Sequence, residues 1–148
     1  MLYTGIDLIE IARIERAVAR WGDRFLRHVY TPAELAAYRG RLPSLAARWA
    51  AKEATAKLLG IGLRGLGGSG TKPTDSAAWL EIEVLADALG RPALRLYGRA
   101  AARADALALH TIAISLSHTR EHAIASAVAL ASGGPAQISL PESPRSPQ

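Results

Sequence analysis

Residues 44–60 of the chain read SLAARWAAKEATAKLLG, an alanine-rich stretch that is typical of a helix. Ser44 is placed to begin this helix. Gly60 is placed to end it, because glycine readily adopts the backbone conformation that follows a last helical turn. We therefore predict a helix over 44–60 that carries Lys52, Glu53 and Lys57 among small apolar side chains.

The segments before this helix predict a strand and then further helices. Side chains alternate over residues 2–9, which predicts a strand whose Asp7 points away from its neighbours in sequence. Apolar residues then recur at helical spacing, and Gly22 indicates two helices in place of one. A capping box from Thr31 to Glu34 starts another short helix. The apolar residues at helical spacing are Ile11, Ile14, Val18, Trp21 and Phe25.

The segments after the central helix complete an α+β pattern. Residues 62–76 are rich in glycine and predict a loop. Strands are predicted over 80–85 and 93–97, a helix over 99–109, and a hairpin of two strands over 112–117 and 123–130. We expect one α+β domain over residues 1–130, with an antiparallel sheet packed against helices. The tail 131–148 is rich in proline, glycine and serine and is predicted to be disordered.

Composition narrows the classes of function. The chain has 148 residues, enough for one domain, and no cysteine, which excludes disulfides and thiolate metal sites and suits the cytoplasm. It has no apolar run long enough to span a membrane, and its first residues lack the basic start of a signal peptide. A net charge of +5 favours acidic or phosphorylated partners.

Two acidic residues are candidates for a metal site. Asp7 lies on the first strand and Glu53 on the central helix, so they would form a hard-oxygen site for Mg²⁺ if the fold brings them together. Lys57, one turn after Glu53, could then neutralise a phosphate. The alternative is that Asp7 ends a strand ladder and Glu53 pairs with Lys57 on the helix surface. Spacing alone leaves both interpretations open.

A histidine and a row of arginines are the other candidates. His118 follows a strand at a turn, where it could bind a phosphate, donate a proton or simply be solvated. Arginines opposite the apolar face form a positive ridge, suited to an acidic helix or a phosphate backbone. A nucleic-acid-binding module is therefore an alternative, although it gives Asp7 and Glu53 no role. The ridge consists of Arg13, Arg16, Arg20, Arg24 and Arg27.

Six blocks of the sequence resemble, in order, the motifs of the holo-acyl carrier protein synthase family. The two most specific are the helix segment from Ala47 to Lys57 and the strand end from Ile114 to Thr119. Together the blocks span roughly residues 4–130. Ile61 and Arg91 depart from the family, which commonly has threonine and lysine there, and the segment 64–79 is longer than expected. The other four blocks are 5–14, 24–35, 59–63 and 90–92.

The resemblance implies an activity and a mechanism. The family transfers 4′-phosphopantetheine from coenzyme A to a serine of an apo-acyl carrier protein, depends on Mg²⁺ and releases adenosine 3′,5′-bisphosphate. By resemblance, Asp7 and Glu53 bind the metal, and Lys57 contacts the pyrophosphate. These three residues would be catalytic, with either Glu53 or a water ordered by Asp7 taking the serine proton.

The resemblance also implies binding residues and partners. Arg48, His118 and Pro92 would hold the nucleotide end of coenzyme A, and the ridge residues Arg13, Arg20 and Arg24 would dock the acidic helix of the carrier. The family is typically a homotrimer with active sites between subunits, and neither nucleic acid nor membrane is expected as a partner. A chain that has kept the fold and lost the reaction is a second alternative.

Overall fold

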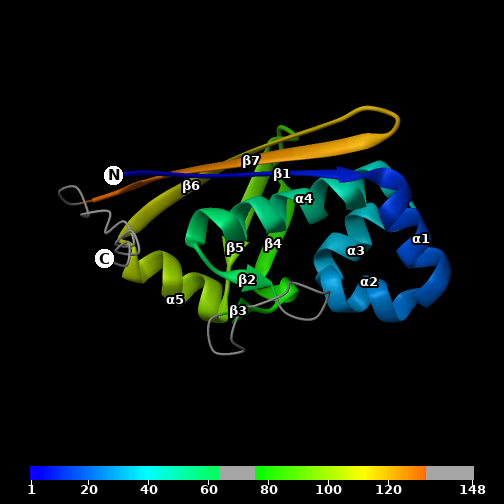
Figure 1. Ribbon diagram of the computed structural model, residues 1–148, viewed down its shortest axis with the longest axis horizontal. Coiled ribbons are helices and arrows are strands. Elements are labelled where there is room, and N and C mark those ends of the chain that lie inside the picture. Colours follow the sequence, from blue (N-terminus) through cyan, green and yellow to red (C-terminus); the bar gives the residue numbers. More distant parts are fainter. Residues whose placement is uncertain (64–75, 133–148) are drawn as a thin grey trace, which may run out of the picture.

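Helix α4 (Leu42–Leu59) lies along one face of a three-stranded antiparallel sheet in the computed structural model (Figure 1), which describes residues 1–63 and 76–132. The sheet has the strand order β1–β7–β6, formed by β1 (Leu2–Glu10), β6 (Leu109–His118) and β7 (His122–Ala131). The predicted α+β class, the first strand and the final hairpin are confirmed. Strand β7 includes Ala131, one residue beyond the predicted boundary, and residues 133–148 of the predicted tail lie outside the described part.

Small side chains allow α4 to lie close to this sheet. The residues of β7 that face the helix are all alanines, each at most 3% exposed: Ala123, Ala125, Ala127 and Ala129. Helix α4 is buried on almost every side, as its run of alanines permits. It begins at Leu42, earlier than the predicted Ser44, because Pro43 is tolerated in the first helical turn, where no backbone N–H is needed.

Gly5 is the point of closest approach between β1 and α4. A Cβ atom at this position would overlap the carbonyl oxygen of Ala54 and lie 2.9 Å from the backbone N of Leu58. Both neighbours are backbone atoms of a buried helix, so neither can move aside as a flexible side chain would. The absence of a side chain at Gly5 therefore sets the distance between β1 and α4.

We expect Gly5→Ala to lower the free energy of unfolding by about 1–3 kcal/mol, the usual cost of forcing an extra carbon into a packed interior. Urea denaturation followed by circular dichroism measures the change. Thr4→Ala, at an exposed position next to Gly5, is the matched control. Equal stability of the Gly5→Ala and Thr4→Ala variants would show that β1 and α4 are not in tight contact.

The opposite face of the sheet is apolar and exposed. It carries large aliphatic side chains from β1 and β7, with exposed fractions between 37% and 66%. Successive side chains of each strand point alternately to this face and to the buried one, as expected for a strand. Its large aliphatic residues are Leu2, Ile6, Leu8, Ile124, Val128 and Leu130.

The N-terminal helices lie at one end of α4. Helix α1 (Ile11–Trp21) and helix α2 (Asp23–Val29) are separate, because Gly22 has φ of 52°, a conformation that favours glycine. The predicted break is confirmed. Trp21, the last residue of α1 and one of the apolar residues at helical spacing, is 48% exposed. The same break divides the arginine ridge between the two helices.

Helix α3 (Pro32–Tyr38) begins with the predicted capping box, in which Thr31 and Glu34 exchange hydrogen bonds. Glu34 also belongs to a fully buried network, which the sequence did not predict. The Lys52 ammonium donates to Glu34 Oε2 at 2.8 Å, to the Val29 carbonyl at 2.8 Å and to the Trp79 carbonyl at 3.1 Å. The side chains of Lys52 and Glu34 are both 0% exposed. This ion pair ties α4 to α3 and to the segments on either side.

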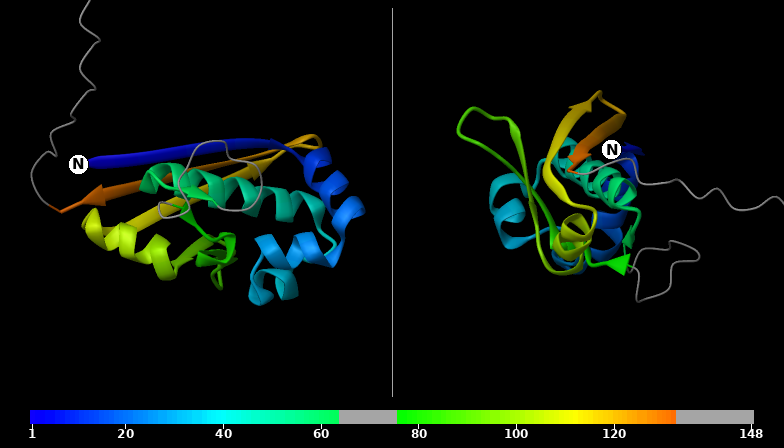
Figure 2. Two further views of the ribbon diagram at one scale, coloured as in Figure 1. Left: turned by 60° about the horizontal axis from the view of Figure 1, so that its bottom comes forward. Right: turned by 90° about the vertical axis from the view of Figure 1, so that its left-hand side faces the viewer.

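The remaining elements pack beside the sheet. A hairpin of β4 (Ile82–Ala86) and β5 (Pro92–Leu96) projects next to β6, and helix α5 (Gly98–Ala106) follows it (Figure 2). The predicted strand over 80–85 begins later, because Trp79–Glu81 forms the 3₁₀ turn η2, and the predicted helix over 99–109 ends earlier. Residues 62–76 were predicted to be a loop, yet β2 (Gly62–Leu63) and β3 (Ser76–Ala77) form a short parallel pair. Residues 64–75 of that loop lie outside the described part.

Candidate active site

Lys57 and Asp7 form a direct contact between α4 and β1. Lys57 Nζ donates to Asp7 Oδ1 at 2.8 Å and to the carbonyl oxygen of Ile6 at 3.0 Å. The Asp7 side chain is 17% exposed and that of Lys57 is 54% exposed, so the pair lies at the surface with the carboxylate on the inner side. Asp7 points toward the helix and away from Ile6 and Leu8, as predicted, because side chains alternate along β1.

Glu53 belongs to the same cluster. It lies one turn before Lys57 and is partly buried. Burial raises the pKa of Glu53, the negative charge of Asp7 raises it further, and Lys57 and Arg13 oppose both effects. Charges at a protein surface act strongly only over short distances, so these influences place Asp7 and Arg13 near Glu53. The surface pair predicted between Glu53 and Lys57 is not what forms, because the Lys57 ammonium is bonded to Asp7.

The cluster fits a magnesium ion that substrate phosphate helps to hold. Asp7 on β1 and Glu53 on α4 are both close enough to Lys57 to contribute carboxylate oxygens to such an ion, because Asp7 is bonded to Lys57 and Glu53 lies one turn before it. Within residues 1–63 and 76–132, no group of three or more His, Cys, Asp or Glu side chains is placed to hold a metal alone. Mg²⁺ commonly uses only one or two carboxylates and fills its other positions with water and phosphate oxygens. The donor set therefore suits Mg²⁺ and is too small for a site built of protein ligands alone.

The raised pKa of Glu53 makes stability depend on pH. The folded chain holds this proton more tightly than the unfolded chain, so the free energy of unfolding falls as pH rises above the ordinary glutamate value of 4.5 toward the raised pKa. Glu53→Gln removes the buried charge. We expect the variant to melt at a higher temperature than the natural chain at pH 8, with the difference vanishing below pH 4.5. Thermal melts across this range measure it, and a difference that does not change with pH would contradict the assignment.

Arg48 lies on another side of α4, away from the carboxylate cluster. Its guanidinium stacks on the ring of Tyr38, 3.4 Å from the centroid, and its Nη1 donates to the Ser44 carbonyl at 3.2 Å. The residue is only 8% exposed, and its buried Nε has no hydrogen-bond partner among the described residues. Arg48 thus offers a free donor, at a different place from the carboxylates.

His118 and Pro92 are also apart from the cluster. His118 is exposed at the end of β6, with Nδ1 3.2 Å from the Thr119 carbonyl, and it aligns with Ala123 and Ile9 across the sheet. Two strand spacings, about 10 Å, separate it from β1. Pro92 begins β5 and pairs with Ala86. One copy of the chain therefore assembles the carboxylates and Lys57 but not the residues expected to hold the nucleotide.

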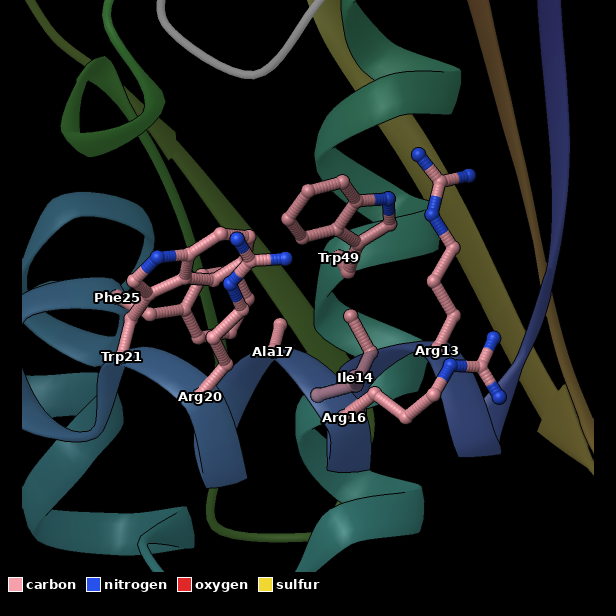
Figure 3. Close-up of a pocket in the computed structure, with 8 residues that line it drawn as sticks. All are labelled: Arg13, Ile14, Arg16, Ala17, Arg20, Trp21, Phe25 and Trp49. Atoms are coloured by element: carbon pink, nitrogen blue, oxygen red, sulfur yellow. The ribbon is translucent and has the colours of Figure 1, made fainter.

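A groove of about 420 Å³ runs along α1 (Figure 3). Three arginines of α1 line it together with aromatic rings from α1, α2 and α4. The guanidinium of Arg20 lies 4.9 Å from the Trp21 ring centroid, and that of Arg13 lies 6.0 Å from the Trp49 centroid. Arg24, on α2 beyond Gly22, is not among the lining residues. The groove is lined by Arg13, Ile14, Arg16, Ala17, Arg20, Trp21, Phe25 and Trp49.

The aromatic part of this groove was missed by sequence reasoning. Trp21 was placed among the apolar residues at helical spacing, and Trp49 within the predicted helix over 44–60. The one available signal was the presence of both tryptophans and Phe25 near the arginine ridge. No helix in the described ranges is both long and apolar enough to cross a membrane.

Comparison with known proteins gives consistent matches. The family model for the 4′-phosphopantetheinyl transferase superfamily matches residues 3–127. The holo-[acyl-carrier-protein] synthase of Chloroflexus aurantiacus is 56% identical over 136 residues, covering 88% of this chain and 99% of the relative. That of Herpetosiphon aurantiacus is 53% identical over 130 residues, with the same coverage.

Solved structures of holo-[acyl-carrier-protein] synthases have a fold similar to that of this chain. Helicobacter pylori holo-[acyl-carrier-protein] synthase in complex with coenzyme A has a TM-score of 0.70 and 28% identity, covering 86% of this chain and 99% of that one. The Chronobacterium ammoniagenes ACPS–CoA complex has a TM-score of 0.69 and 34% identity, covering 87% and 96%. These matches favour the transferase over the nucleic-acid-binding alternative. By sequence and by fold, the chain belongs to the holo-[acyl-carrier-protein] synthase family of the 4′-phosphopantetheinyl transferase superfamily and is an enzyme of that class.

Proposed function

We propose that the chain transfers 4′-phosphopantetheine from coenzyme A to a serine of an apo-acyl carrier protein, in a Mg²⁺-dependent reaction that releases adenosine 3′,5′-bisphosphate. The observation that carries this proposal is the bond between Lys57 on α4 and Asp7 on β1, with Glu53 one helical turn before Lys57. The relatives named as holo-[acyl-carrier-protein] synthases, two of them solved with coenzyme A, support the choice of substrates.

Each residue of the cluster has a role in this reaction. Asp7 and Glu53 would hold Mg²⁺, which stabilises negative charge on the phosphoryl oxygens. Lys57 neutralises the pyrophosphate of coenzyme A from the adjacent turn. The carrier serine oxygen forms a bond to the phosphorus that bears the pantetheine arm, and the bond from that phosphorus to the bridging oxygen breaks. The serine proton passes to Glu53 or to a water ordered by Asp7, and adenosine 3′,5′-bisphosphate leaves.

A second copy of the chain completes the substrate site in this proposal. Arg48, Pro92 and His118 are assigned to the nucleotide end of coenzyme A, yet none of them reaches the cluster of their own chain. The exposed apolar face of the sheet supports association, because large aliphatic patches on a monomer commonly mark protein interfaces. We therefore place the active sites between the subunits of a homotrimer. Sedimentation equilibrium tests this, and a fully active monomer at micromolar concentration would exclude it.

The arginine-lined groove is the proposed docking site of the carrier. Arg13 and Arg20 contribute positive charge at its rim, and Arg24 extends that charge onto α2. The aromatic rings of the groove offer an apolar surface beneath these charges. A helix with acidic and apolar residues on one side fits such a surface, with the charges guiding approach and the rings excluding water.

We expect Arg20→Gln to raise the KM for the carrier about tenfold with little change in kcat. Arg20 lies at the rim of the groove, so it aids docking without touching the reacting atoms. Steady-state kinetics at varied carrier concentration measure the effect. Arg95→Gln removes the same charge from β5, where the side chain is 69% exposed, and serves as the control. A lower kcat at unchanged KM in Arg20→Gln would contradict the docking role.

The proposed function has a direct test. The protein is incubated with coenzyme A, Mg²⁺ and a panel of apo-carrier proteins, and each carrier is weighed by mass spectrometry. We expect one carrier to gain the mass of a single phosphopantetheine arm, and a carrier with alanine in place of the accepting serine to gain none. Chelation of the metal should abolish the gain. A panel in which no carrier changes mass would count against the proposal. The cytoplasmic location expected from the lack of cysteine stays a prediction.

A further inference from the structure

The Lys57 ammonium is bonded to Asp7, one of the two carboxylates that are assigned to the metal. Two of its three N–H donors are committed to β1, one to Asp7 Oδ1 at 2.8 Å and one to the Ile6 carbonyl at 3.0 Å. These contacts hold the lysine across the strand in a defined position. Lys57 thus presents one positive charge where a divalent cation would bind.

The negative charge of Asp7 is already paired. Its carboxylate lies 2.8 Å from the Lys57 ammonium, and Glu53 lies one turn before Lys57 on α4. A divalent ion at Asp7 adds two positive charges beside this ammonium. Its binding is therefore opposed unless a cation leaves or negative charge arrives.

Asp7 and Lys57 differ in their freedom to move. Asp7 is 17% exposed and is fixed on a strand that pairs with β7 along its whole length. Lys57 is 54% exposed and ends a flexible four-carbon chain, so its ammonium can swing toward solvent without disturbing the fold. A pyrophosphate near α4 offers the ammonium a more highly charged partner than a single carboxylate.

From this geometry we infer that Lys57 couples the binding of the metal to the binding of coenzyme A. Its ammonium blocks divalent cations from Asp7 until the pyrophosphate of coenzyme A draws the ammonium away. The inference rests on the proposed function. Metal binding and coenzyme A binding then strengthen each other, since each favours the arrangement in which Lys57 has left Asp7. The metal alone binds weakly, and metal with coenzyme A binds well.

Binding of Mn²⁺, followed by electron paramagnetic resonance, tests the coupling without any transfer reaction. We expect Lys57→Met to bind Mn²⁺ alone about tenfold more tightly than the natural chain, a modest value because solvent screens the exposed ammonium. Coenzyme A should tighten Mn²⁺ binding by a larger factor in the natural chain than in Lys57→Met, because phosphate ligation of the metal acts in both and displacement of the ammonium acts only in the natural chain. Lys57→Gln should behave as Lys57→Met does, and Lys57→Arg should retain the coupling.

The control is Arg27→Met, which removes one positive charge from an exposed position on α2 where the side chain is 74% exposed. Its Mn²⁺ binding should equal that of the natural chain. The inference is overturned if folded Lys57→Met and Lys57→Gln bind Mn²⁺ alone no more tightly than the natural chain, or if coenzyme A tightens binding equally in all variants. Failure of the proposed function looks different: the natural chain would neither bind Mn²⁺ with coenzyme A nor modify any carrier.

Discussion

Glu53→Gln is expected to lower kcat/KM for carrier modification by about 10³-fold or more, a loss of about 4 kcal/mol of transition-state stabilisation. The substitution keeps the size of the side chain and removes its negative charge. Whether Glu53 binds the metal or accepts the serine proton, its charged carboxylate is required. The rate of mass gain by the carrier, measured at several carrier and coenzyme A concentrations, gives the effect.

The matched control is Glu15→Gln, which removes the same charge from an exposed position on α1 and should retain normal turnover. Loss of folding cannot explain a slow Glu53→Gln variant, since the same substitution is expected to raise the melting temperature at neutral pH. A variant that is inactive and yet more stable would link the raised pKa to the reaction. Near-normal turnover of Glu53→Gln would reject Glu53 as a member of the active site.

Lys52→Met should lower the free energy of unfolding by about 3–5 kcal/mol, because it leaves the fully buried Glu34 without its counter-charge. Glu34 would keep the hydrogen bonds from the backbone N of Thr31 and Val84, but these do not replace a cation. Burial lowers the pKa of Lys52, and the neighbouring Glu34 opposes that effect, so the two charges depend on each other. Urea denaturation followed by tryptophan fluorescence or circular dichroism measures the loss.

The double variant Lys52→Met with Glu34→Gln separates the ion pair from packing. Once the carboxylate is neutral, the missing ammonium costs less, so the double variant should be more stable than Lys52→Met alone. Losses that simply add would show that the two side chains do not interact. The single variant Glu34→Gln completes the comparison and also reports on the capping box, because Glu34 accepts from Thr31 N at 2.8 Å.

Local signals in the sequence predicted several elements well. The capping box from Thr31 to Glu34, the separation of α1 from α2 at Gly22 and the end of α4 before Gly60 all depend on residues close together in the chain. The alternation of β6 and β7 likewise predicted their hairpin. Such features follow from short-range chemistry, which is why the sequence alone could indicate them.

Features that depend on distant partners were not predictable in the same way. Glu34 was interpreted as a capping residue, and nothing in its neighbourhood indicates that Lys52, 18 positions away, is bonded to it inside the core. Trp21 fitted the apolar spacing of one long helix, and only the turn at Gly22 leaves it exposed. Arg48 is buried against the ring of Tyr38, a contact that no local pattern indicates, and its assignment to the nucleotide stays a prediction.

The candidate site illustrates both cases. Asp7 and Lys57 are 50 positions apart, and their contact follows from the close packing at Gly5, which no local pattern reveals. The sequence could show only that carboxylates and a lysine were present on the right kinds of element. Their assignment as one cluster came from the family resemblance, and the structure supplies the contact between Asp7 and Lys57.

The stacking of aromatic rings at the groove allows binding there to be followed by intrinsic tryptophan fluorescence. All three tryptophans of the chain gather there: Trp21 and Trp49 line the groove, and Trp79 lies 4.1 Å from Trp49 between ring centroids. Emission from these indoles depends on the polarity of their surroundings. A carrier that covers the half-exposed Trp21 would exclude water from that ring. A blue shift of the unlabelled protein on titration would then give the affinity of each carrier before any chemistry takes place.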